Sequence, residues 1–235
     1  MSDYGKLKEL AFVGNKKLGE SGLVLLTWGN VSAFDPEQKV FAIKPSGVDY
    51  DTMTADDMVV VDLEGKVVEG GLRPSSDTKT HLELYRAYPQ LGSVIHTHSK
   101  WATIWCQQQR DLPCMGTTHA DFFYGPVPCT RAISRAEIEE DYEMNTGKII
   151  VQTLKERGID PLEVPAILTG GHAPFVWGKT VDKALENSIV LERVAEMAFM
   201  NHLMDPAVPP LAQHILNKHY TRKHGKNAYY GQQNR

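Results

Sequence analysis

The sequence predicts a single α/β domain with three layers, in which helices cover both faces of a mainly antiparallel sheet. Its 235 residues suit one hydrophobic core. Short apolar strand-like runs follow one another in the first third of the chain, and strand and helix patterns alternate after that. Neither an internal repeat nor a linker interrupts this order, so we expect one domain over residues 1–235.

The N-terminal part predicts one helix followed by antiparallel strands. Apolar residues recur near a 3.6-residue period from Tyr4 to Leu18, and Gly19 ends the pattern. Short β-type segments follow at residues 23–27, 40–43 and 58–69. The last of these turns back at Glu64-Gly65, which is typical of a hairpin.

The remainder predicts helices that alternate with two further strands. Helices are expected at residues 80–88, 100–108, 134–158, 181–204 and 211–220, and strands at residues 93–98 and 164–168. The longest central helix begins with a capping box, in which Ser134 is followed three residues later by Glu137. A glycine, Gly158, ends that helix.

Composition and charge narrow the class of protein. With 42% hydrophobic residues, 23% charged residues and a net charge of −4, the chain is typical of a globular protein and not of a general nucleic-acid or membrane-surface binder. Its three cysteines form no Cys-x-x-Cys pair, so neither a disulfide framework nor a thiolate zinc site is indicated. Because the sequence also has no signal peptide and no run of 18 apolar residues, we expect a cytoplasmic protein.

A His-x-His pair is the sharpest local feature. In a strand, residues i and i+2 lie on one face, so His96 and His98 would present two imidazoles side by side. Imidazole is a common metal ligand, and a catalytic site needs at least one more protein ligand. Candidates are His172 in a Gly-Gly-His turn and the acidic Asp77. An ordinary polar strand face or a general-base histidine stays open as an alternative.

Three small polar turns could hold a phosphate group. They expose backbone N–H groups and side-chain hydroxyl or amide groups, and one of them follows a lysine. The residues concerned are Gly29, Asn30, Lys44, Ser46, Gly47, Ser75 and Ser76. Each turn taken alone is also common loop chemistry.

Two further segments carry groups that could transfer protons. The loop at residues 116–125 contains His119, Asp121 and Tyr124, and Asp121 is a candidate proton carrier. A basic run near the C-terminus leads to Tyr229-Tyr230. A tyrosine can serve as an acid or base, although a solvated tail is the simpler interpretation of this segment.

Six motifs occur together in one order: Thr27-Trp-Gly-Asn-Val-Ser32, Lys44-Pro-Ser-Gly47, Pro74-Ser-Ser-Asp-Thr78, His96-Thr-His98, Gly116-Thr-Thr-His-Ala-Asp121 and Arg222-Lys-His-Gly225. In this combination the chain resembles the class II aldolase family, and within it the L-ribulose-5-phosphate 4-epimerases. The likeness extends almost to Tyr230. One departure is Ala173, where the family usually has glycine after the third histidine.

The resemblance implies roles for particular residues. A zinc-type divalent ion, for which manganese or cobalt could substitute, would be held by Asp77, His96, His98 and His172. The three polar turns would line the substrate and phosphate pocket, with Lys44 close by. Asp121 and Tyr230 correspond to the family's acid/base pair.

The resemblance also implies a reaction and an assembly. The epimerases interconvert L-ribulose 5-phosphate and D-xylulose 5-phosphate by breaking and re-forming the C3–C4 bond. Since they are C4 homotetramers with sites between subunits, Tyr230 and His219 would complete the site of an adjacent chain. An aldolase that releases its products, or a non-catalytic sugar-phosphate-binding module, is the alternative. Similar enzymes serve L-arabinose and L-ascorbate breakdown, and the sequence assigns the chain to neither pathway.

Overall fold

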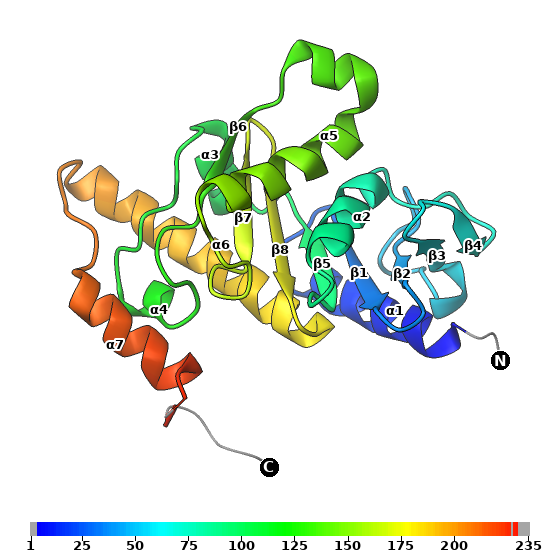
Figure 1. Ribbon diagram of the computed structural model, residues 1–235, viewed down its shortest axis with the longest axis horizontal. Helices are drawn as coiled ribbons and strands as arrows, with labels where there is room; N and C mark the ends of the chain where they lie inside the picture. Colours follow the sequence, from blue (N-terminus) through cyan, green and yellow to red (C-terminus); the bar gives the residue numbers. More distant parts are fainter. Residues whose placement is uncertain (1–3, 227, 230–235) are drawn as a thin grey trace.

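The computed structural model describes residues 4–226 and 228–229, which form a three-layer αβα domain (Figure 1). Within the described residues the central sheet has eight strands in the order β4-β3-β2-β1-β5-β8-β7-β6. Neighbouring strands run antiparallel except for the parallel pair β6–β7. The predicted fold class is therefore confirmed.

The strands are β1 (Asn30–Asp35), β2 (Val40–Ile43), β3 (Val59–Asp62), β4 (Val67–Glu69), β5 (Ser93–His96), β6 (Cys129–Ala132), β7 (Ala166–Gly170) and β8 (Pro174–Gly178). The α-helices are α1 (Gly5–Glu20), α2 (Thr78–Ala87), α3 (Lys100–Gln107), α4 (Thr117–Ala120), α5 (Arg135–Glu156), α6 (Val181–Met204) and α7 (Gln213–His224), with a short 3-10 helix η1 (Ala55–Asp57).

Apolar residues pack on both faces of the sheet and separate the layers, because side chains alternate between the faces of each strand. Val31 and Ile95 pack toward α1 and the start of α6 on one face. Phe34 and Val94 pack toward α2 and α5 on the other. In Figure 1, α5 and α2 accordingly lie across one face of the sheet. The same alternation directs Asn30 and His96, which are paired across β1 and β5, to the face that α2 covers.

Most predicted elements are present close to their expected bounds. The helix predicted at residues 181–204 is α6, and the hairpin predicted at residues 58–69 is formed by β3 and β4. The strand predicted at residues 93–98 ends earlier, at His96, so that His98 lies in the loop that follows. Among the residues described, no helix is both long enough and apolar enough to cross a membrane.

The strand predicted at residues 23–27 is wrong. This segment is a loop in which Leu26 has a positive φ of 54° and is 76% exposed, while Leu23 is buried in the core and Val24 packs against it. The apolar run had suggested a buried strand, but the first strand is the more polar β1, in which Ser32 is buried between β2 and β5. Tertiary burial, not local hydrophobicity, decides which segment joins the sheet.

The central helix predicted as one piece is interrupted at Asp141. The backbone there has φ −168° and ψ 97°, so two helical segments meet at a kink within α5. The capping box at its start is confirmed, because Ser134 accepts from the Glu137 backbone and Glu137 accepts from the Ser134 backbone. The kink brings the residues after Asp141 to the site described next.

Candidate active site

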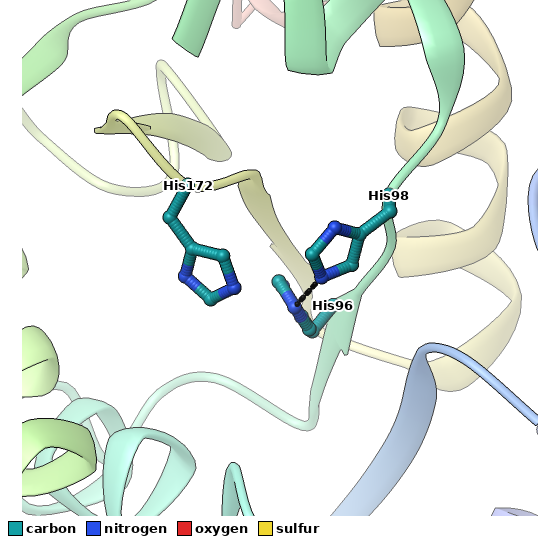
Figure 2. A group of neighbouring side chains, drawn as sticks. All are labelled: His96, His98 and His172. Carbon is teal, nitrogen blue, oxygen red and sulfur yellow. Dashed lines mark hydrogen bonds between the residues drawn. The ribbon is translucent and has the colours of Figure 1, made fainter. Parts of the chain in front are cut away.

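Three imidazoles from two distant parts of the chain converge at the end of the central strands (Figure 2). His96 is the last residue of β5, His98 follows it in a loop, and His172 comes from the loop between β7 and β8. One ring nitrogen from each lies within 4.8 Å of the others. The turn that carries His172 is closed by a hydrogen bond from its backbone N–H to Thr169 O at 3.0 Å, and Ala173 fits there, fully buried.

The ring of His96 has a defined tautomer. Its Nδ1 lies 3.0 Å from the backbone oxygen of Pro174, which can only accept, so Nδ1 carries the proton. The lone pair of His96 is therefore on Nε2, 3.2 Å from Nε2 of His98. A carbonyl partner behind a histidine ring is also the usual arrangement for imidazoles that bind metal ions.

The three imidazoles fit a divalent cation. Two nitrogens bound to one tetrahedral zinc ion lie about 3.3 Å apart, given Zn–N bonds of about 2.05 Å, and the His96–His98 separation is similar. In addition, Nδ1 of His172 is buried and finds no hydrogen-bond partner in the described part of the chain. A site of three imidazoles that leaves room for another ligand has the composition of a catalytic centre.

The surroundings favour the neutral form of His98 and His172. Burial, followed by the neighbouring imidazoles of His96 and His98, lowers the pKa of His172 to about 4. Burial and His96 also lower the pKa of His98. Neutral imidazole is the form that binds a metal ion, so the site is preorganised for one at neutral pH.

Asp77 stands beside the imidazoles, immediately before the first residue of α2. Its Oδ2 accepts a hydrogen bond of 2.7 Å from the Asn30 side-chain amide. Burial raises the pKa of Asp77, but the neighbouring imidazoles and this hydrogen bond outweigh that effect and leave the pKa below its ordinary value. Asp77 lines the same pocket as the imidazoles but is not a member of the 4.8 Å cluster.

These groups line one pocket of about 500 Å³, which is within the size range of small-molecule sites. The structure brings together here the metal-ligand candidates Asp77, His96, His98 and His172 and the predicted substrate-binding residues Gly29, Asn30, Lys44, Ser46, Gly47, Ser75 and Ser76. All of them belong to segments that meet at the same end of β1, β2, β5 and β8.

Two glycines shape this pocket in different ways. Gly29 has φ +74°, and a Cβ there would lie 2.8 Å from the backbone oxygen of His96. Gly47 has φ +72° and faces open space. Gly29 therefore allows the backbone to approach the His96 strand closely, whereas Gly47 keeps a turn open to the pocket.

Lys44 is the cation nearest to the polar turns in this pocket. Its side chain is only 1% exposed, its Nζ donates to Thr27 O at 3.3 Å, and it lies 4.7 Å from the centre of the Tyr50 ring. Burial lowers its pKa to about 8, and the charge of Asp49 opposes that shift in part. An anion in the pocket would be stabilised by Lys44 and would favour its charged form.

Residues that sequence reasoning did not select also line the pocket, notably Trp28, Tyr142 and Glu143. The Trp28 ring lies 6.2 Å from His98, and the Tyr142 ring lies 6.0 Å from His172. Tyr142 and Glu143 follow the kink in α5 and had been assigned to the interior of a regular helix. The sequence carries no clear indication of that kink.

The predicted proton-transfer residues lie elsewhere. Asp121 follows α4, and it accepts hydrogen bonds from His219 at 3.1 Å and from Arg222 at 3.0 Å, both on α7. Figure 1 shows α4 and α7 at the end of the molecule away from α2 and β2. Neither Asp121 nor His219 lines the histidine pocket. Tyr230 lies outside the described residues.

Comparisons with known proteins identify the family and the fold. Residues 10–199 match the model of the class II aldolase and adducin N-terminal domain. The chain is 55% identical, over 97% of its length and 99% of the other, to L-ribulose-5-phosphate 4-epimerase UlaF of Salmonella paratyphi C. A solved L-fuculose 1-phosphate aldolase superposes with a TM-score of 0.78 at 25% identity, covering 94% of this chain and 97% of that one. L-fuculose-1-phosphate aldolase from Thermus thermophilus shares the fold, with a TM-score of 0.65, 23% identity and coverage of 88% and 99%.

Proposed function

The chain belongs to the class II aldolase and adducin family, and we propose that it interconverts L-ribulose 5-phosphate and D-xylulose 5-phosphate. The observation that carries this proposal is the convergence of three imidazoles and three polar turns in one pocket of about 500 Å³. The identity of 55% to an epimerase over nearly the whole length of both chains supports the choice of reaction.

The reaction must break a carbon–carbon bond. C4 of a 2-ketose has no acidic proton beside the carbonyl, so simple deprotonation cannot invert it. Cleavage of the C3–C4 bond instead gives glycolaldehyde phosphate and the enediolate of dihydroxyacetone, and recombination on the other face of the aldehyde gives the epimer. The site must therefore stabilise an enediolate and retain the aldehyde while it turns.

In this proposal, the part of the pocket that contains the histidines stabilises the enediolate. His96, His98 and His172, with Asp77 beside them, would hold zinc or its substitutes manganese and cobalt. When bound, such a cation supplies Lewis-acid stabilisation of developing negative charge on oxygen.

The polar turns bind the phosphate in this proposal. Gly47 and Ser46 form an open turn on one side of the pocket, and Ser75 and Ser76 form another. Lys44 lines the same pocket with its side chain withdrawn from solvent, where a charge–charge contact is stronger than in water. By holding the phosphate, these groups would keep the aldehyde in place between cleavage and recombination.

Proton transfer is assigned to Asp121 and Tyr230, acting on opposite faces of the aldehyde. Because Asp121 and His219 lie outside the pocket of their own chain, the proposal places them in the pocket of a neighbouring subunit of a homotetramer. The bidentate contact from Arg222 and the contact from His219 hold the Asp121 carboxylate in one orientation. The three cysteines are free thiols, which supports the predicted cytoplasmic location.

A product-releasing aldolase is the second candidate, favoured by the superposition on L-fuculose 1-phosphate aldolase. The aldolases resemble one another in having glutamate at the position of Asp77, and Asp121 belongs to the epimerase pattern. These two residues favour epimerisation.

One assay tests the proposal. Purified protein is incubated with L-ribulose 5-phosphate, and the products are separated by chromatography that resolves the pentuloses. We expect D-xylulose 5-phosphate, and we expect activity to fall at least ~100-fold after removal of divalent ions with a chelator and to return when zinc is added. Free glycolaldehyde phosphate alone would indicate an aldolase, and no product, or undiminished turnover after chelation, would contradict the proposal.

A further inference from the structure

A fourth histidine, His81, lies behind the pocket without lining it. It is one turn into α2, where its backbone N–H donates to Asp77 O at 3.1 Å, and its side chain is 0% exposed. Residues i and i+4 share a helix face, and helical side chains lean toward the N-terminus, so the ring of His81 lies toward Asp77.

A chain of hydrogen bonds fixes the tautomer of His81. The backbone N–H of Val94 can only donate, and it donates to the Tyr85 hydroxyl at 3.1 Å. The hydroxyl hydrogen of Tyr85 is then directed to Ser32 Oγ at 2.6 Å, much closer than its other acceptor, Ser32 O at 3.4 Å. Ser32 Oγ–H in turn is directed to His81 Nδ1 at 2.7 Å, much closer than its other acceptor, Val94 O at 3.5 Å. Nδ1 of His81 therefore accepts, and its neutral ring carries the proton on Nε2.

This Nε2–H group is buried and has no hydrogen-bond partner among the residues that the structure describes. A buried unpaired donor costs about 1–3 kcal/mol, so an acceptor nearby would be strongly favoured. His96 offers none, because its Nδ1 already donates to Pro174 O and its Nε2 faces His98. Two acceptors near Asp77 are free within the described residues: the buried Asn30 Oδ1, and the Asp77 carboxylate, of which Asn30 holds only Oδ2. The carboxylate forms the stronger hydrogen bond because it is charged.

We propose that His81 is a positioning residue for Asp77: its Nε2–H donates to the carboxylate when Asp77 turns toward the cation. The sheet thus sets the orientation of Asp77 through Ser32 and Tyr85. This inference rests on the proposed metal role of Asp77. Loss of such a supporting hydrogen bond typically weakens metal affinity about 10- to 100-fold.

The test measures zinc affinity by chelator competition in His81→Phe and His81→Gln, each alone and combined with Asp77→Ala. We expect His81→Phe to bind zinc about 10- to 100-fold more weakly, and His81→Gln, which keeps a donor, to recover at least part of that loss. In the Asp77→Ala background, His81→Phe should have no further effect, because the two residues act as one unit. His119→Phe, which alters a buried histidine outside the pocket, should bind zinc as the wild type does.

Folding of each metal-free variant is checked by circular dichroism and thermal unfolding. If His81→Phe does not fold, Ser32→Ala is measured in its place. This change removes the hydroxyl that holds the proton of His81 on Nε2, and it should weaken zinc binding by a smaller factor. An equal loss of zinc affinity on His81→Phe with and without Asp77 would overturn this inference and leave the proposed function standing. Unchanged zinc affinity in both His81→Phe and Ser32→Ala would do the same. A wild-type protein that bound no zinc would instead contradict the proposed function.

Discussion

At the scale of single residues, His119 shows how the fold keeps a histidine neutral. It is only 2% exposed, and its Nε2 lies 2.7 Å from Gly125 O, which can only accept. Its Nδ1 is buried, and no residue within 4–226 or 228–229 forms a hydrogen bond with it. Burial lowers its pKa to about 4, although the hydrogen bond to Gly125 acts in the opposite direction. Protonation would therefore leave a charge in the interior without compensation.

This shift predicts a loss of stability in acid. In the unfolded chain a histidine binds a proton below its ordinary pKa of about 6.5, whereas folded His119 does so only near a pKa of about 4. Between these values the unfolded state binds more protons, so stability falls as the pH falls. We expect His119 to account for about 2 kcal/mol of lost unfolding free energy between about pH 7 and pH 5.

Urea unfolding of the metal-free protein at the two pH values measures this loss. His119→Gln, which keeps a donor for Gly125 O but does not titrate, should show a correspondingly smaller difference between the neutral and the acidic solution. An identical difference in both proteins would assign the acid sensitivity to other groups.

At the scale of secondary structure, the kink in α5 is a second helix start inside what the sequence presents as one helix. Asp141 has extended backbone angles and accepts from Met144 N at 3.2 Å, which is the geometry of an N-cap residue. Its other oxygen accepts from Lys79 of α2 at 2.6 Å. Through these two contacts Asp141 sets the position of Tyr142 and Glu143 at the pocket.

Two substitutions at Asp141 separate these contacts. Asp141→Ala removes both, and we expect it to lower the unfolding free energy by about 1 kcal/mol, the usual worth of an N-cap. Asp141→Asn keeps the cap and loses the ion pair, whose partners are 52% and 27% exposed, so its cost should be at most about 0.5 kcal/mol.

Urea unfolding compares the stabilities, and the Michaelis constant for the sugar phosphate reports on the pocket. It should rise severalfold in Asp141→Ala and less in Asp141→Asn, since only the first frees the helix start. An unchanged constant in both variants would show that the kink does not control the pocket.

At the scale of the whole molecule, the groups proposed for catalysis are divided between two ends of the folded domain. The cation and phosphate groups gather where β1, β2, β5 and β8 meet α2, and Asp121 is held between α4 and α7 at the other end (Figure 1). In a closed ring of identical subunits, each such pair of ends can meet across a head-to-tail contact.

This arrangement predicts complementation between two inactive variants. His98→Asn should lose the cation, and Asp121→Asn should keep it but lose at least ~100-fold in turnover. If the variants are unfolded together and refolded as a mixture, about a quarter of the sites will combine an intact pocket with an intact Asp121 from the neighbour. The recovered activity should approach that fraction of the wild-type value.

The two variants refolded separately and then mixed briefly provide the control and should stay inactive. No recovery in the mixture that was refolded together would contradict a shared site. Asp121→Asn with full activity on its own would refute the acid/base role of Asp121.

Much of the fold and the chemistry of the pocket can be read from the order of residues alone. Periodicity placed α6, the β3–β4 hairpin and the capped start of α5, because these signals are local: apolar spacing, turn glycines and capping residues. The motifs also identified the polar turns and the histidines that now line one pocket. A strand period put His96 and His98 on one side, even though β5 ends at His96.

The other features depend on contacts between segments far apart in the chain, so they became visible only in the folded molecule. Burial between β2 and β5 makes polar β1 a strand and leaves the apolar residues 23–27 a loop. Contact with Lys79 and the local cap fix the kink at Asp141, which brings Tyr142 into the pocket. The hydrogen bonds behind Asp77 join α2 to β1 and β5, and no pattern within any one of these three elements encodes them.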